Sequence, residues 1–235
     1  MNPRTRTVGA TAVLVAMLAA CGSSSHASST PITVFNVAAD PTKSLPVIDT
    51  KHPVALTAAA LRSALDSLLS THAALVAALV DQVVGGSTTP NAAISALAAN
   101  TEALTNTIDQ VYGANAARAF AQLWAQHTQF FIDYANAAYR HDGSAKEQAE
   151  SKLGDYQNDF ASFVSTATAG GASLAAVAGL LHGHVHDITS YIDAAVNGDR
   201  LGTRRILAES VVHMHVIAKA VTRAILAQHL KTVRG

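Results

Sequence analysis

Three histidines recur at nearly equal intervals in this chain of 235 residues, each inside an apolar stripe of helical spacing. They are His72, His127 and His184. Their surroundings align as LRSALDSLLSTHAALVAALVDQVV, AARAFAQLWAQHTQFFIDYANAAY and SLAAVAGLLHGHVHDITSYIDAAV. Large apolar residues stand three, four and seven positions from each histidine, so they share one face of a helix with it. The pattern predicts three helices that bury one imidazole each.

The stripes are the first halves of three repeated units, residues 61–113, 116–168 and 173–225. Turn-forming residues end each first half, and they are Gly85-Gly86, His141-Asp142-Gly143 and Asn197-Gly198-Asp199. Helix-start signals follow: Ser144 with Glu147 has the pattern of a capping box, and Asp199 can cap the last helix. We therefore expect an all-α fold of six helices, arranged as three antiparallel αα-hairpins in one bundle.

Composition supports a helical globular fold and argues against nucleic acid as a partner. Apolar residues make up 49% of the chain, charged residues 14% and aromatic residues 5%. The apolar residues are mostly Ala, Leu and Val, a composition that favours helices. The formal net charge is zero and no basic stretch crosses the body, so nucleic acid is not an expected partner.

The N-terminus reads as an export signal. Residues 1–20 combine Arg4 and Arg6 with an apolar run too short for a comfortable membrane span, which predicts a signal peptide. The following LAAC, ending at Cys21, resembles the lipobox of bacterial lipoproteins, which implies cleavage before Cys21 and lipidation of its thiol. Cys21 is the only cysteine, so it has no disulfide partner in the chain. We expect a lipid anchor at the outer face of the cytoplasmic membrane.

Three further segments complete the expected organisation. Residues 21–53 are rich in Ser, Thr and Pro, as in a flexible tether, and residues 54–230 hold the helical repeats. Residues 231–235 form a short basic tail.

A polar residue occupies an equivalent place in the second half of each unit, and these residues are Asn100, Tyr156 and His213. Each lies about as far past the turn as the repeated histidine lies before it. We therefore expect each histidine to face a polar partner across its hairpin.

Two interpretations of the histidines remain open. In the first, they are structural, because a buried imidazole needs hydrogen-bond partners that Asn100, Tyr156 and His213 can supply. In the second, His72, His127, His184 and His213 converge on a transition metal, copper or zinc, for which imidazole is a suitable ligand. His182 and His186 share the opposite helix face from His184, and His215 turns away from His213, so we expect all three at the surface.

Catalysis is not expected. No carboxylate stands in register with the histidines, and no serine lies in a nucleophile elbow. The sequence favours a non-catalytic cell-envelope lipoprotein whose core histidines bind a metal. The alternatives are a ligand-free interaction or scaffold module with structural histidines and, third, a metal-dependent enzyme.

With LLSTH, LWAQHTQFFIDYANAA, GLLHGHV and HMHVIA, residues 57–228 resemble a family of exported helical proteins from Gram-positive bacteria. Its members are often labelled as lipoproteins or by association with a copper amine oxidase-like accessory domain. The resemblance implies an all-helical extracellular module without an assigned enzymatic activity. This chain lacks the accessory domain to which the copper label belongs. It also has Thr71 where an acidic residue often precedes the first histidine of the family.

Overall fold

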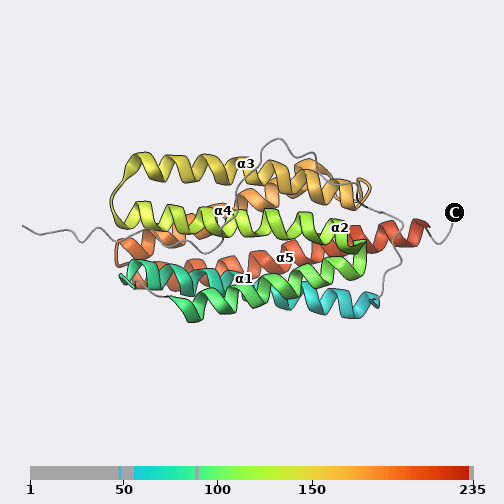
Figure 1. Ribbon diagram of the computed structural model, residues 1–235, viewed down its shortest axis with the longest axis horizontal. Coiled ribbons are helices and arrows are strands. Elements are labelled where there is room, and N and C mark those ends of the chain that lie inside the picture. The colour runs from blue at the N-terminus through green and yellow to red at the C-terminus, as the bar shows by residue number, and fades with distance from the viewer. Residues whose placement is uncertain (1–47, 49–55, 88–89, 233–235) are drawn as a thin grey trace, which may run out of the picture. The chain divides into compact units, whose positions relative to one another are not determined.

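Five α-helices make up almost all of the chain that the computed structural model describes, namely residue 48 and residues 56–87 and 90–232 (Figure 1). The helices are α1 (Ala58–Val84), α2 (Asn91–Tyr139), α3 (Gly143–Ala167), α4 (Leu174–Val196) and α5 (Arg200–Thr232). The described residues contain no strand. The all-α fold class is thus confirmed. Cys21, the signal and the tether lie outside the described residues, except for Ile48 of the tether, which is buried in the core.

The predicted turn residues separate the helices. Gly86 lies between α1 and α2 and Gly198 between α4 and α5, with φ angles of 74° and 71°; His141, in the predicted turn between α2 and α3, has φ 55°. Such positive φ angles are the usual way in which a glycine ends a helix. The chain therefore reverses direction where the sequence indicated.

One predicted cap is correct and one is wrong. Asp199 accepts a hydrogen bond from the backbone N–H of Gly202 at 2.8 Å and so caps α5, as expected. Ser144 does not begin α3, because Asp142 takes that place and accepts from the N–H of Ala145 at 3.0 Å. A carboxylate is as good a cap as a hydroxyl, and here it lies two residues closer to the preceding helix.

The long helix α2 contains a single break. Gly113 has φ 79° and ψ 171°, a conformation outside the helical region, while the residues on both sides are helical. The structure therefore has five helices rather than six, because residues 91–112 and 114–139 join in one element. The arrangement as three repeated hairpins is not established by it and stays a prediction.

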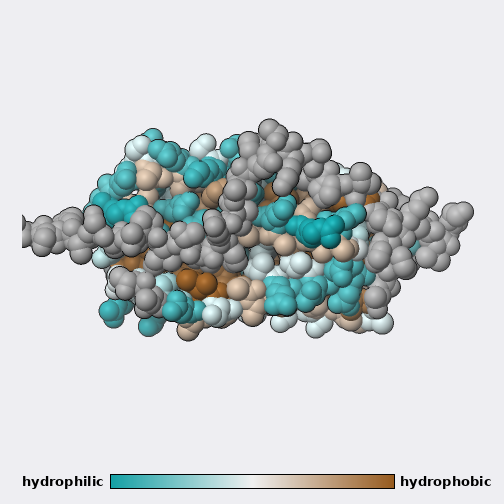
Figure 2. Space-filling model, in the orientation of Figure 1, coloured by the Kyte–Doolittle hydropathy of each residue, from teal (hydrophilic) through white to brown (hydrophobic). Residues whose placement is uncertain are grey.

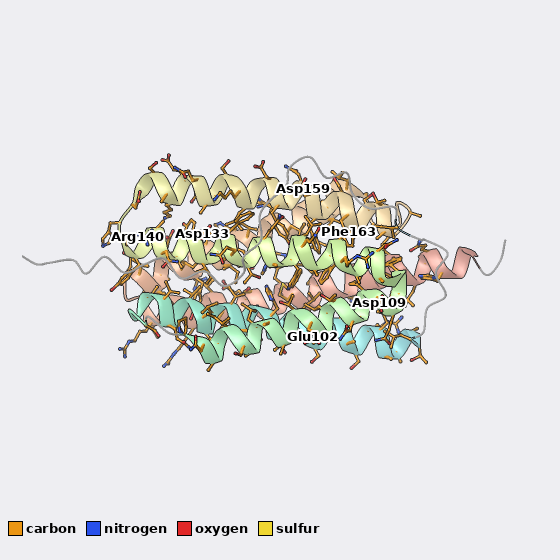
Figure 3. All side chains as sticks on the ribbon, in the orientation of Figure 1. Glu102, Asp109, Asp133, Arg140, Asp159 and Phe163 are labelled. Carbon is orange, nitrogen blue, oxygen red and sulfur yellow. The ribbon has the colours of Figure 1, made fainter. Side chains whose placement is uncertain are left out.

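Two apolar clusters fill the space between the helices, and the three histidines mark the boundary between them. In α1, α2 and α4 alike, the large residue before the histidine belongs to the first cluster and the one after it to the second. These pairs are Leu69 and Val76, Trp124 and Phe131, and Leu181 and Ile188. Phe163 of α3, labelled in Figure 3, is a buried member of the first cluster. The histidines thus form a polar layer between the two apolar clusters.

The surface of the helical part carries both hydrophilic and apolar residues. Hydrophilic and apolar residues are interspersed on the face shown in Figure 2, and Glu102 and Asp109 of α2, labelled in Figure 3, are exposed. Two helical segments, Ala58–Val84 and Arg200–His229, are long and apolar enough to cross a membrane by length and composition alone. In the bundle, 44% and 39% of their most apolar windows are buried, and both segments supply residues to the core.

A candidate metal centre of three buried histidines

The three repeated histidines meet in the interior, as predicted. His72 comes from α1, His127 from α2 and His184 from α4, and these helices contact one another pairwise. One ring nitrogen from each lies within 4.8 Å of the other two. The exposed fractions of the side chains are 0%, 0% and 3%, so the group is closed to solvent.

A single hydrogen bond joins the group. Nε2 of His72 lies 3.1 Å from Nε2 of His127, so one of the two nitrogens donates and the other accepts. Both Nδ1 atoms of this pair and both ring nitrogens of His184 are buried without a hydrogen-bond partner. An unpaired buried polar group costs about 1–3 kcal/mol. The metal-free cluster is therefore a local source of instability.

Aromatic rings fix the orientation of the imidazoles. The centroid of Trp124 lies 4.6 Å from those of His72 and His127, and Tyr156 stacks on His127 at 4.7 Å with an interplanar angle of 14°. Phe131 meets His184 edge to face at 5.7 Å. These contacts restrict ring rotation and exclude water, which preorganises the nitrogens.

Burial keeps the cluster uncharged. Desolvation, followed by repulsion from the other two histidines, lowers the pKa of His72 well below its ordinary value. Desolvation also lowers the pKa of His127. The backbone of Trp124 and of Leu123 opposes this shift, although Nδ1 forms no hydrogen bond of normal geometry. Desolvation and the nearby His213 lower the pKa of His184 to about 4. At neutral pH all three imidazoles are neutral, the form that binds metals.

Asn100 and Tyr156 do not supply the expected hydrogen bonds. The amide of Asn100 donates to the carbonyl of Leu68 at 3.0 Å, and its own carbonyl oxygen has no partner. Tyr156 lies against the predicted residue, His127, but the contact is ring stacking. The reason is geometric: equal distance from a turn brings two residues side by side across a hairpin, but does not aim their polar atoms at each other.

His213 lies beside the cluster and is not part of the close group. Its Nδ1 lies 3.0 Å from Oδ2 of Asp187, and the two side chains are 22% and 21% exposed. A Cβ added to Gly183 would overlap with the His213 ring, so this glycine allows α5 to approach α4 closely. The prediction of a four-histidine set is thus corrected to three histidines and one neighbour held by a carboxylate.

The histidines predicted at the surface are there. His182 and His186 are exposed on α4, and His215 is exposed on α5. His215 pairs with Asp66 of α1 through Nδ1 at 2.7 Å. The helical period therefore separated the inner from the outer histidines correctly.

An apolar cavity of about 60 Å³ reaches His184 from the first cluster. Its walls include Phe120, Trp124, Tyr156 and Met214. His184 is the one member of the three-histidine group that lines it.

Sequence reasoning missed Asp187 and the crowding at Gly183. Both signals are present in the chain: Gly183 directly precedes His184, and Asp187 follows Gly183 by one helical turn. A small residue and a carboxylate on one helix face indicate a place where a neighbouring polar ring can lie. No family model, no curated protein and no solved structure matches this chain.

Proposed function

We propose that this protein is a non-catalytic envelope protein that binds one transition-metal ion, zinc or copper, through His72, His127 and His184. Each of three repeated helical units would supply one of these ligands. The observation that carries the proposal is the convergence of three neutral imidazoles in a dry interior, with one ring nitrogen of each within 4.8 Å of the other two.

The donor set suits these metals. Imidazole nitrogens bind zinc at about 2.0 Å, so two nitrogens of a tetrahedral site lie roughly 3.3 Å apart. The Nε2 atoms of His72 and His127 are 3.1 Å apart, close to that spacing. His184 has to move nearer to close the set, and neither of its ring nitrogens has a hydrogen bond to break.

The structural alternative has less support. It required each buried histidine to be satisfied by a polar partner, and Asn100, Tyr156 and His213 form no hydrogen bond with the three histidines. A purely structural cluster would retain an energetic cost that apolar residues at the same positions avoid. A metal bound through the two Nε2 atoms and one nitrogen of His184 would satisfy an otherwise unpaired nitrogen of His184, the residue with two such atoms.

We also propose that the protein is held at the outer face of the cytoplasmic membrane by lipid on Cys21. The support is the LAAC sequence after a short apolar run, and the lack of a second cysteine. Substitution Cys21→Ser should move the protein from the membrane fraction to the soluble fraction. If the Cys21→Ser protein has its signal segment removed and still sediments with membranes, the lipid anchor is refuted.

Calorimetric titration tests the metal site. Metal-free protein should bind one Zn²⁺ or Cu²⁺ per chain, and His184→Leu should abolish this binding. The matched control is the double variant His182→Ala/His186→Ala, which removes the two exposed histidines of the same helix and should bind as the wild type does. Binding that survives in His184→Leu and disappears in the double variant would instead locate the metal at the surface.

A further inference from the structure

A metal ion needs a route to a site whose three ligands are at most 3% exposed. On the side of α5, the neighbour of His184 is His213, whose side chain is 22% exposed. His213 is therefore a partly exposed neighbour of the buried cluster.

Helix α4 holds the His213 ring in place through two residues. Gly183 provides the space, because any Cβ at this position would overlap with Cε1 of His213. Asp187 provides the partner, with its Oδ2 3.0 Å from Nδ1. The His213 ring also interacts electrostatically with His184, so it lies beside the cluster.

The pairing with Asp187 also sets the chemistry of the ring. A carboxylate can only accept, so Nδ1 of His213 carries the proton and donates it. In the neutral form of this ring the lone pair lies on Nε2, the other ring nitrogen. Carboxylates commonly orient metal-binding histidines in this way.

We propose that His213 is a transfer ligand, whose Nε2 takes up the metal ion from solvent and passes it to His184. This role rests on the proposed metal site. It explains why a histidine and a carboxylate lie at the edge of the cluster without joining the three-histidine group. A transfer ligand lowers the activation barrier for metal entry and for metal release by the same amount. It therefore speeds both steps equally and leaves the equilibrium affinity unchanged.

The chain contains its own reporter for the test. Trp124 is the only tryptophan, and its ring lies 4.6 Å from His72 and His127. Cu²⁺ held by these histidines would quench the indole fluorescence, because the imidazole rings that would bind it lie against the indole. Stopped-flow mixing with Cu²⁺ then gives the association rate, and mixing the loaded protein with a chelator gives the release rate.

The variants are His213→Ala and Asp187→Asn, and the control is His215→Ala. His215 lies on the same helix and pairs with a carboxylate in the same way, but on the exposed side with Asp66. We expect both rates to fall about tenfold in the two variants, the scale of effects when an outer contact of a metal site is lost. The affinity should be unchanged, and His215→Ala should behave as the wild type.

Other outcomes would overturn the transfer role. A weaker affinity with an unchanged association rate in His213→Ala would make His213 a permanent fourth ligand. Rates equal to the wild type in both variants would place the route elsewhere. If the wild-type protein shows neither quenching nor a heat of binding, the metal site itself is refuted, and the transfer role with it. Circular dichroism confirms that each variant is folded.

Discussion

Nε2 of His72 and Nε2 of His127 lie 3.1 Å apart in the interior of the bundle, in contact with each other and with no other hydrogen-bonding group. One proton is shared between them, which requires the two rings to be in different tautomers. A metal that binds both Nε2 atoms requires the same tautomer in both rings, with the protons on Nδ1. The metal-free pair therefore holds two ligands at nearly the right spacing in a form that must rearrange.

Acid should destabilise the metal-free protein. His184 has a pKa of about 4 in the folded state and about 6.5 when unfolded. Below pH 6.5 the unfolded chain binds a proton that the folded protein excludes, so stability is full above that pH and falls as the pH approaches 4. The loss from this group alone should be roughly 3 kcal/mol at pH 4. Urea unfolding at pH 7, 5.5 and 4 measures it.

The variant His184→Leu is the control for that series. It should lose less stability between pH 7 and pH 4 than the wild type, because it lacks the imidazole that takes up a proton only on unfolding. Equal losses in both proteins would show that His184 is not the group that acid protonates.

The same substitution separates a ligand from a structural residue at constant pH. Leucine fills a similar volume and leaves no unpaired ring nitrogen, so His184→Leu should raise the free energy of unfolding of the metal-free protein by about 1 kcal/mol. Urea unfolding at pH 7.5 with a chelator present measures the change. A clear loss of stability would support the structural interpretation of the histidines.

Gly113 should be required for the break in α2. Its φ of 79° and ψ of 171° belong to a region that only glycine occupies readily. Gly113→Ala should therefore lower the free energy of unfolding by about 1–3 kcal/mol. Gly179 is the matched control: it lies inside α4 with no neighbouring atom within 4 Å of an added Cβ. Gly179→Ala should leave stability unchanged or raise it by up to about 1 kcal/mol.

The candidate site was predictable in part. Apolar spacing placed His72, His127 and His184 inside, because a helix repeats its faces regularly and the stripe runs through each histidine. The same period placed His182 and His186 outside. The hydrogen-bond partners were not predictable, because ring orientation depends on packing between helices that are distant in sequence.

His213 shows where the reasoning from the repeat failed. It occupies the same place in its unit as Asn100 and Tyr156, which are buried, yet it is partly exposed. The cause is local, since Gly183 and Asp187 hold the ring at the edge of the bundle. The fold class was predictable, because apolar periodicity and turn residues determine each helix from its own stretch of sequence. The number of helices was not, because Gly113 bends α2 without ending it.

The most direct test of the central claim is X-ray absorption at the zinc edge of the loaded protein. The account predicts three imidazole nitrogens at about 2.0–2.1 Å from the metal. The His182→Ala/His186→Ala variant should give the same spectrum. A zinc ion coordinated by fewer than three imidazoles in the wild-type protein would contradict the claim that the buried histidines form a metal site.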